Sequence, residues 1–147
     1  MKATGIVRRI DDLGRVVIPK EIRRTMRIRE GDPLEIYTTR DGEVIFKKYS
    51  LIGGLEEFAA QFCDTLSRST DFSAAVTDRD AVIAMAGAGK KELLGKPLSP
   101  ELERIMAGRG LYCGDGVAVS EEDNGYRAAV AAPILCEGDV LGAVLFL

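Results

Sequence analysis

The sequence predicts an α+β protein in two parts: β-hairpins with one short helix at the N-terminus, then an antiparallel sheet with helices on one side. Three observations lead to this prediction. Residues 1–50 consist of short β-branched runs separated by turn residues. In residues 55–147, helical and strand patterns follow one another in an order that suits an antiparallel sheet. The net charge also changes sign between the two parts.

Length and composition limit the classes of protein that this chain can form. With 147 residues, 46% of them hydrophobic, the chain suits one or two small globular domains and is too apolar for disorder. No apolar run approaches the roughly 20 residues of a membrane-spanning helix, and the N-terminus lacks the apolar core of a signal peptide. The absence of histidine excludes a His-ligated zinc ion and a Ser-His-Asp triad. These observations predict a cytoplasmic, reduced, soluble protein that is not a hydrolase. For the chain as a whole we expect no metal, no cofactor and no enzymatic activity.

The charges are distributed unevenly along the chain. Residues 1–50 hold 12 basic and 8 acidic side chains, a net charge of +4, whereas residues 51–147 hold 8 basic and 15 acidic ones, a net charge of −7. A basic region suits a polyanion such as nucleic acid, whose phosphates attract clustered arginines. An ordinary solvated surface would also explain the modest excess of positive charge.

The first half of the basic region predicts a hairpin followed by a helix. Thr4–Ile10 and Arg15–Ile18 are β-branched and apolar enough to form strands, and Asp11–Gly14 between them is rich in turn residues. Pro19 cannot donate to a sheet and suits the first turn of a helix. We expect that helix over Lys20–Arg27.

The second half predicts another hairpin, and the region as a whole predicts a dimer. Leu34–Thr38 and Val44–Phe46 are joined through Asp41-Gly42, a strong hairpin signal. Fifty residues with such short elements bury too little apolar surface to be comfortably stable alone. A symmetric dimer that exchanges strands would supply the missing contacts, so we expect an obligate dimer.

Residues 1–25 closely resemble the DNA-binding domain of the AbrB family of bacterial transition-state regulators. The most specific segment is Leu-Gly-Arg-Val-Val-Ile-Pro at residues 13–19, followed by Arg23 and Arg24, and the similarity continues through Gly31–Ile36 to Lys47–Tyr49. The resemblance implies a domain-swapped dimer in which the hairpins of two chains interleave. It also implies a regulator of transcription that binds double-stranded DNA, and the acidic second part is similar in layout to a two-domain sporulation regulator of this family.

The resemblance further implies that DNA is contacted by the side chains of Arg8, Arg15, Arg23 and Arg24. Arginine suits this role because its planar fork binds phosphate in a bidentate manner and stays protonated. It can also read guanine or enter a narrow minor groove. The alternative is that Arg8 and Arg15 only form exposed ion pairs with Asp11, Asp12 or Glu21.

The remaining residues predict three helices and five strands. A joint at Leu51–Gly54 precedes a helix in which Leu55, Phe58, Ala59, Phe62 and Leu66 share one face. Ser99 and Pro100 are typical of the start of a further helix that ends near Ala107. The other expected elements are a short helix over Lys90–Leu94 and strands over Ala74–Thr77, Ala81–Met85, Leu111–Val119, Tyr126–Ile134 and Val140–Leu147.

The end of the chain is similar to the closing hairpin of a GAF domain, a small-molecule-sensing module. The similarity rests on Pro133-Ile134 and on Gly138–Val144, which has the pattern Gly-x-x-Leu-Gly-Ala-Val. It implies a GAF-like sensor over residues 55–147, next to the DNA-binding domain over residues 1–50. The usual final helix of a GAF domain is missing after Leu147, which leaves open whether dimers associate further into tetramers. The effector is unknown.

Four alternatives remain. Some GAF domains are thiol enzymes that reduce methionine sulfoxide, and Cys113 or Cys136 could serve such chemistry, although we favour small core residues as the explanation of Cys63, Cys113 and Cys136. Small swapped-hairpin domains also act as antitoxins. The segment Gly87–Lys91 resembles a phosphate-binding loop. The motif, however, requires a glycine at position 84 and a Ser or Thr at position 91, and this chain has Ala84 and Lys91. Glu121–Asp123 could hold a cation weakly.

Overall fold

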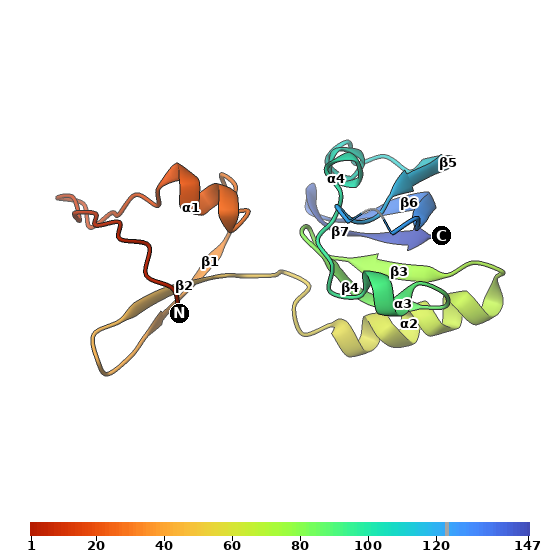
Figure 1. Cartoon of the computed structure of the whole chain (residues 1–147), viewed down its shortest axis with the longest axis horizontal. Helices are drawn as coiled ribbons and strands as arrows, with labels where there is room; N and C mark the ends of the chain where they lie inside the picture. The colour runs from red at the N-terminus through yellow and green to blue at the C-terminus, as the bar shows by residue number, and fades with distance from the viewer. Residues whose placement is uncertain (123) are drawn as a thin grey trace. The chain divides into compact units, whose positions relative to one another are not determined.

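The chain divides into two compact units, Met1–Lys48 and Tyr49–Leu147, in a computed structural model that describes residues 1–122 and 124–147 (Figure 1). Helices and antiparallel strands occur in both units, which confirms the α+β class. No helix of the described residues is long and apolar enough to cross a membrane. The two units are described separately below.

The first unit holds one short helix and one two-stranded sheet. Helix α1 spans Lys20–Thr25, and strands β1 (Leu34–Thr38) and β2 (Val44–Lys48) pair antiparallel with Ile36 opposite Phe46. Gly42 in the connecting turn has φ +84°, a conformation that favours glycine. The predicted second hairpin is therefore confirmed, with β2 two residues longer than expected.

The two strands predicted over Thr4–Ile10 and Arg15–Ile18 are wrong for the single chain. Neither segment is paired with another strand, although the expected turn forms between them. A strand needs a neighbouring strand to satisfy its N–H and C=O groups. Within one chain, no segment of the described residues supplies that neighbour to either of them.

Helix α1 is also shorter than the predicted helix over Lys20–Arg27. Arg27 has φ +54°, so the backbone turns into the left-handed region and cannot continue the helix. The N–H of Ile28 donates to the carbonyl of Arg23 at 2.8 Å across this end. The ammonium group of Lys48 donates to the Arg27 carbonyl at 3.0 Å, which ties the helix end to β2.

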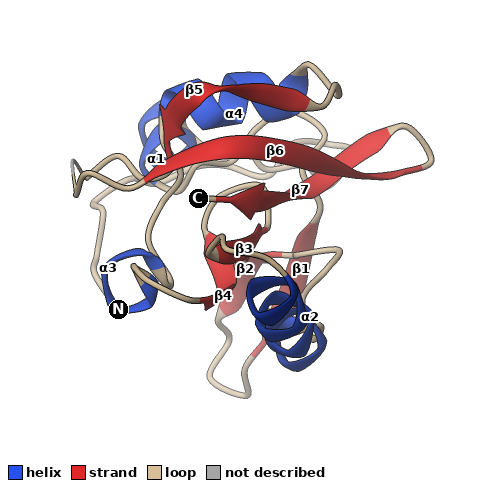
Figure 2. Cartoon of the chain, turned by 90° about the vertical axis from the view of Figure 1, so that its right-hand side faces the viewer, coloured by secondary structure: helices blue, strands red, loops and turns tan. Residues whose placement is uncertain are grey.

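The second unit is a five-stranded antiparallel sheet with strand order β4-β3-β7-β6-β5 (Figure 2). The strands closely follow the predicted ones. Glu137 (φ +51°) and Gly138 (φ +86°) form the two-residue turn between the last two strands. The bounds are α2 Glu56–Ser69, β3 Ala74–Thr77, β4 Val82–Ala86, α3 Lys90–Leu93, α4 Pro100–Ala107, β5 Tyr112–Ala118, β6 Arg127–Cys136 and β7 Asp139–Phe146.

Helices lie on both faces of this sheet, so the prediction of helices on one side is wrong. Helix α2 packs against β3 and β4, whereas α4 packs against β5, β6 and β7 from the opposite face (Figures 1 and 2). Successive side chains of a strand point to opposite faces of the sheet. Because both faces are covered here, all four residues of β3 are buried. Ala74 and Val76 belong to the cluster below α2, and Ala75 belongs to the cluster on the other face.

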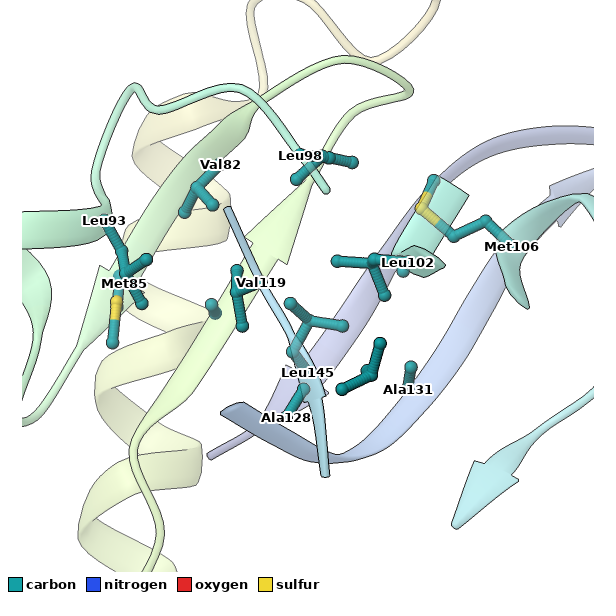
Figure 3. Packing of buried hydrophobic residues seen from close by; sticks show 13 residues of the cluster. Val82, Met85, Leu93, Leu98, Leu102, Met106, Val119, Ala128, Ala131 and Leu145 are labelled. Atoms are coloured by element: carbon teal, nitrogen blue, oxygen red, sulfur yellow. The ribbon is translucent and has the colours of Figure 1, made fainter. Parts of the chain in front are cut away.

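The larger core lies between the sheet and the helices α3 and α4 (Figure 3). Leu93 comes from α3, Leu102 and Met106 from α4, and Leu145 from β7, and each is at most 4% exposed. Ser99 caps α4 as predicted: its hydroxyl accepts the N–H of Leu102 at 3.0 Å and donates to the carbonyl of Ala118. The start of α4 is thereby attached to the end of β5.

The smaller cluster under α2 corrects the predicted buried face of that helix. Ala59 and Cys63 point to the sheet and are 5% and 0% exposed, whereas Phe58 and Phe62 are 67% and 40% exposed. The two phenyl rings stack on the outside of the helix, 6.3 Å apart between centroids. Small residues face the sheet, and the two aromatic side chains of the predicted stripe lie outside.

Two glycines of the motifs singled out above have packing reasons. A Cβ at Gly142 would collide with the carbonyl oxygen of Thr77, so only glycine allows β7 to approach β3 this closely. Gly89 has φ +93°, and a Cβ there would lie 2.8 Å from the Tyr126 ring. Gly89 thus leaves room for the Tyr126 ring to pack against the backbone. Helix α3, which follows Gly89, has only four residues.

Candidate nucleic-acid interface

The turn over Asp11–Arg15 is held by a dense set of local hydrogen bonds. The Asp11 N–H donates to the Arg15 carbonyl at 3.0 Å, and the Gly14 N–H donates to the Asp11 carbonyl at 3.1 Å. Gly14 has φ +79°, which lets the chain reverse here. The two segments that flank the turn are therefore held together where they meet it. They form no ladder of backbone hydrogen bonds beyond the turn.

The carboxylate of Asp11 makes contacts to both the backbone and a side chain of this turn. Its Oδ1 accepts the N–H groups of Leu13 and Arg15 at 2.9 and 2.8 Å. Its Oδ2 accepts Nε–H of Arg15 at 2.7 Å. The bonds from the Arg15 backbone and side chain lower the pKa of Asp11 below its ordinary value of 3.8, so the group is ionised at neutral pH.

Arg8 and Arg15 lie on opposite sides of this turn, and both are exposed. The ion pair of Arg15 with Asp11 is one of the pairs considered from the sequence, yet the Arg15 side chain remains 70% exposed. Among the described residues, none holds the side chain of Arg8 by a hydrogen bond or an ion pair. Both guanidinium groups are accessible to a partner.

Arg23 and Arg24 lie side by side on α1, which begins directly after the buried Pro19. The Nε–H of Arg23 donates to the carbonyl of Ile18 at 3.1 Å, so its side chain is folded back to the start of the helix. Arg24 is exposed and, within the described part of the chain, makes no side-chain hydrogen bond or ion pair. The structure thus presents two pairs of arginines, one at the turn and one on α1.

Other basic side chains of the first unit are held by its own residues. The Lys47 ammonium lies 4.9 Å from the centre of the Tyr37 ring, and Lys48 is bound to the Arg27 carbonyl. Their structural contacts were missed because they depend on the pairing of β1 with β2.

A turn and a short helix that expose four guanidinium groups can bind anionic oxygens. Each Nε–H that is used inside the chain leaves the terminal Nη groups of that arginine free to donate. Phosphate oxygens accept such paired donors in a bidentate manner. Such an arrangement can bind a polyphosphate such as the backbone of nucleic acid.

The second unit offers the three cysteines as its other reactive groups. Cys63 is buried, and this burial raises the pKa of its thiol to about 11, so it stays protonated and weakly nucleophilic at neutral pH. Cys113 and Cys136 are exposed. The acidic group Glu121–Asp123 is not assessed because Asp123 lies outside the described residues.

Two family models match this chain and together cover most of it. The model described as "Stage V sporulation protein T C-terminal, transcription factor" matches residues 54–147. The model described as "Antidote-toxin recognition MazE, bacterial antitoxin" matches residues 7–51.

Similar proteins of Bacillus subtilis (strain 168) match either the whole chain or its first third. Stage V sporulation protein T is 52% identical over 152 residues, covering 99% of this chain and 84% of that protein. The transition state regulatory protein AbrB is 63% identical over 49 residues, covering 33% of this chain and 50% of that protein. The solution structure of the N-domain of the transcription factor abrB is 61% identical, with a TM-score of 0.31, and covers 33% of this chain and 92% of that one.

Proposed function

The chain belongs to the stage V sporulation protein T family of DNA-binding transcription regulators, and from this premise we propose that Arg8, Arg15, Arg23 and Arg24 of a dimeric N-terminal domain contact double-stranded DNA. The exposure of these four guanidinium groups on an ordered turn and helix is the observation that carries the proposal. DNA lies in the cytoplasm, so we place the protein there, as a regulator linked to sporulation.

The exposed apolar side chains of the first unit support an obligate dimer. Within residues 1–48, Pro19 is the one fully buried residue. Val7, Val17 and Ile36 are 87%, 69% and 61% exposed. A region without a core of its own does not offset the entropy lost on folding. A second copy whose segments pair with residues 4–10 and 15–18 would complete both the strands and the core.

The solvent-accessible area of the chain also supports a dimer. The chain exposes 10161 Å², whereas two separate compact proteins of the sizes of its units would together expose roughly 8,800 Å². The excess of roughly 1,400 Å² exceeds the 800 Å² that one partner buries in an interface of standard size. The chain as a whole therefore exposes enough surface for an interface with a second copy.

The direct test of DNA contact is a salt titration of duplex binding by the full chain. Single replacements by alanine at the four arginines should each weaken binding and reduce the dependence on salt, because each removes a phosphate contact. Arg40→Ala, in the β1–β2 turn, removes the same charge from the same unit and serves as the matched control. Equal behaviour of the control and the four variants would contradict the assignment.

We further propose that the second unit is a GAF-like sensor over residues 55–147. Its five-stranded antiparallel sheet, closed by the β6–β7 hairpin, and the opposite charges of the two regions support this role. An effector that binds one arrangement of these units better than another would change DNA affinity by linkage. The test is DNA affinity with and without each compound found to raise the melting temperature of the chain; unchanged affinity would contradict the linkage.

The outer face of α2 supports a further association of dimers into tetramers. Leu55, Phe58 and Phe62 are 50%, 67% and 40% exposed and lie on one side of the helix. Such a stripe is typical of a helix that packs against another one. Sedimentation of the full chain and of Phe58→Ser would detect the larger assembly and its loss.

The enzyme alternative from the sequence is tested by one variant. Replacing Cys63, Cys113 and Cys136 by serine removes every thiol of the chain. A regulator retains DNA binding after this change, whereas a thiol reductase loses its reduction of methionine sulfoxide. Sulfoxide reduction by the wild-type chain that is lost in the variant would establish the enzyme.

A further inference from the structure

We propose that Asp11 is a positioning residue for DNA binding, which holds the Arg15 side chain by Nε and so presents its terminal Nη groups to a phosphate. This inference rests on the proposed contact of Arg15 with DNA and adds a residue of opposite charge to that site. It also removes the conflict between the two interpretations of Arg15 drawn from the sequence, an ion pair and a DNA contact.

The geometry assigns two tasks to one carboxylate. Through Oδ1, Asp11 accepts the backbone N–H groups of Leu13 and Arg15 at 2.9 and 2.8 Å, which shapes the turn. Through Oδ2, it accepts the Nε–H of Arg15 at 2.7 Å, which directs the side chain. The backbone and the guanidinium group of Arg15 are thus both fixed to the same side chain.

The ion pair occupies only part of the guanidinium group. Of the five N–H donors of an arginine, the bond to Oδ2 uses the one on Nε, and the four on the Nη atoms remain. The side chain is 70% exposed, so these donors are accessible. An arginine that is oriented before binding loses less conformational freedom when it meets a phosphate.

Asp12 is a natural control because it carries the same charge at the next position. Asp12 is exposed, and within the described residues its side chain takes part in no hydrogen bond or ion pair. Replacing an exposed aspartate near DNA by asparagine removes repulsion from phosphate and by itself tightens binding. A positioning role predicts the opposite sign at Asp11.

The experiment compares Asp11→Asn and Asp12→Asn in the full chain, with a labelled duplex at two salt concentrations. Asparagine keeps an oxygen that accepts the backbone N–H groups, but it loses the charged partner of Nε. We expect Asp12→Asn to bind up to about 2-fold more tightly and Asp11→Asn to bind about 3- to 10-fold more weakly. If Asp11→Asn binds as tightly as Asp12→Asn, the proposal is overturned.

A double-mutant cycle shows whether Asp11 acts through Arg15. In an Arg15→Ala background, Asp11→Asn should no longer weaken binding and should behave like Asp12→Asn. Arg15→Lys leaves Asp11 and its two backbone bonds in place, so it tests the same dependence without disturbing the turn. A loss that persists in both backgrounds would assign Asp11 to the turn alone and overturn the positioning role.

The same cycle separates this proposal from the one on which it rests. If Arg15→Ala binds DNA like the wild type, Arg15 is not a contact and both proposals fail. If Arg15→Ala weakens binding and Asp11→Asn does not, only the role of Asp11 fails. Circular dichroism melting of each variant, expected to fall only slightly for Asp11→Asn because one exposed charged bond is lost, reports on folding independently of DNA.

Discussion

Residues 49–147 bury Leu102 and Leu145 completely, whereas residues 1–48 leave Val17 69% and Ile36 61% exposed. Both parts contain similar apolar side chains, but only the second has a sheet wide enough, with helices on both faces, to bury a core of its own. The first unit has a single hairpin and one helix of six residues. The comparison teaches that the second unit buries a core by contacts within the chain, whereas the first leaves its apolar side chains exposed, as the proposed dimer requires.

The two regions also differ in their charged groups. The basic region holds an excess of four positive charges, and its arginines are presented outward on short, locally bonded elements. The second region is acidic and repels polyanions. One region therefore holds both the arginine surface for which we propose DNA contact and the exposed apolar surface for which we propose a second copy.

The largest expected effect concerns the charges of the first unit. Replacing Arg8, Arg15, Arg23 and Arg24 together by alanine should weaken duplex binding by at least about 1,000-fold near 0.1 M salt. A dimer with eight such contacts has a slope of log K against log salt of about −7, which should become nearly flat in the variant. The measurement is a fluorescence anisotropy titration at several salt concentrations. A wild-type slope near zero would contradict the assignment.

The second effect tests the self-sufficient core of the second unit. Leu102→Ala removes a side chain that is 0% exposed and should lower the free energy of unfolding of this unit by about 2–5 kcal/mol. Urea unfolding followed by circular dichroism measures the loss, which should not depend on protein concentration. Leu94→Ala, at a site that is 43% exposed, is the matched control with a smaller loss.

A third, smaller effect tests the dependence of the first unit on its partner. Ile36 is 61% exposed in the single chain, where its truncation to alanine would cost little. In the proposed dimer the same change should cost about 1–3 kcal/mol, and the loss should grow as the protein is diluted. Leu111→Ala, at a site that is 67% exposed in the second unit, should change stability little. Equal, concentration-independent melting of both variants would indicate a monomer.

The smallest effect concerns the pH dependence of the turn at Asp11. The pKa of Asp11 is lowered by its bonds to Arg15, so the folded turn favours the ionised carboxylate. This contribution is complete at neutral pH and is lost as the pH falls below the ordinary value of 3.8 and through the lowered pKa. Carboxyl NMR shifts of Asp11 should titrate below the ordinary value of 3.8. Titration of Asp11 at or above that value would contradict the bonding described here.

The elements of both units could be predicted where local patterns determine them. Asp41-Gly42 marks the β1–β2 turn, and Ser99-Pro100 marks the start of α4, because turn and cap preferences act within a few residues. The strand patterns at Thr4–Ile10 and Arg15–Ile18 predict strands that one chain does not form. Their pairing needs a neighbour that the single chain does not supply.

The DNA contacts of the four arginines remain a prediction, and the contacts that these side chains make within the chain were not predictable from the sequence. The four arginines follow from the resemblance to the AbrB family, but the bonds that orient them do not. Arg15 could have paired with any of several acidic residues, and only the folded turn brings Asp11 to it at 2.7 Å. The bond from Arg23 to the carbonyl of Ile18 depends likewise on how α1 starts after Pro19.

The sequence by itself determined the α+β class, most of the helices and strands, the change of charge between the two regions and the family, because these depend on neighbouring residues and on composition. The tertiary structure alone decided which face of α2 is buried, that helices cover both faces of the sheet, and that Asp11 holds Arg15. The physical reason is that burial and orientation depend on residues far apart in the chain or on one particular turn, and a linear pattern does not specify which of several possible partners a side chain meets.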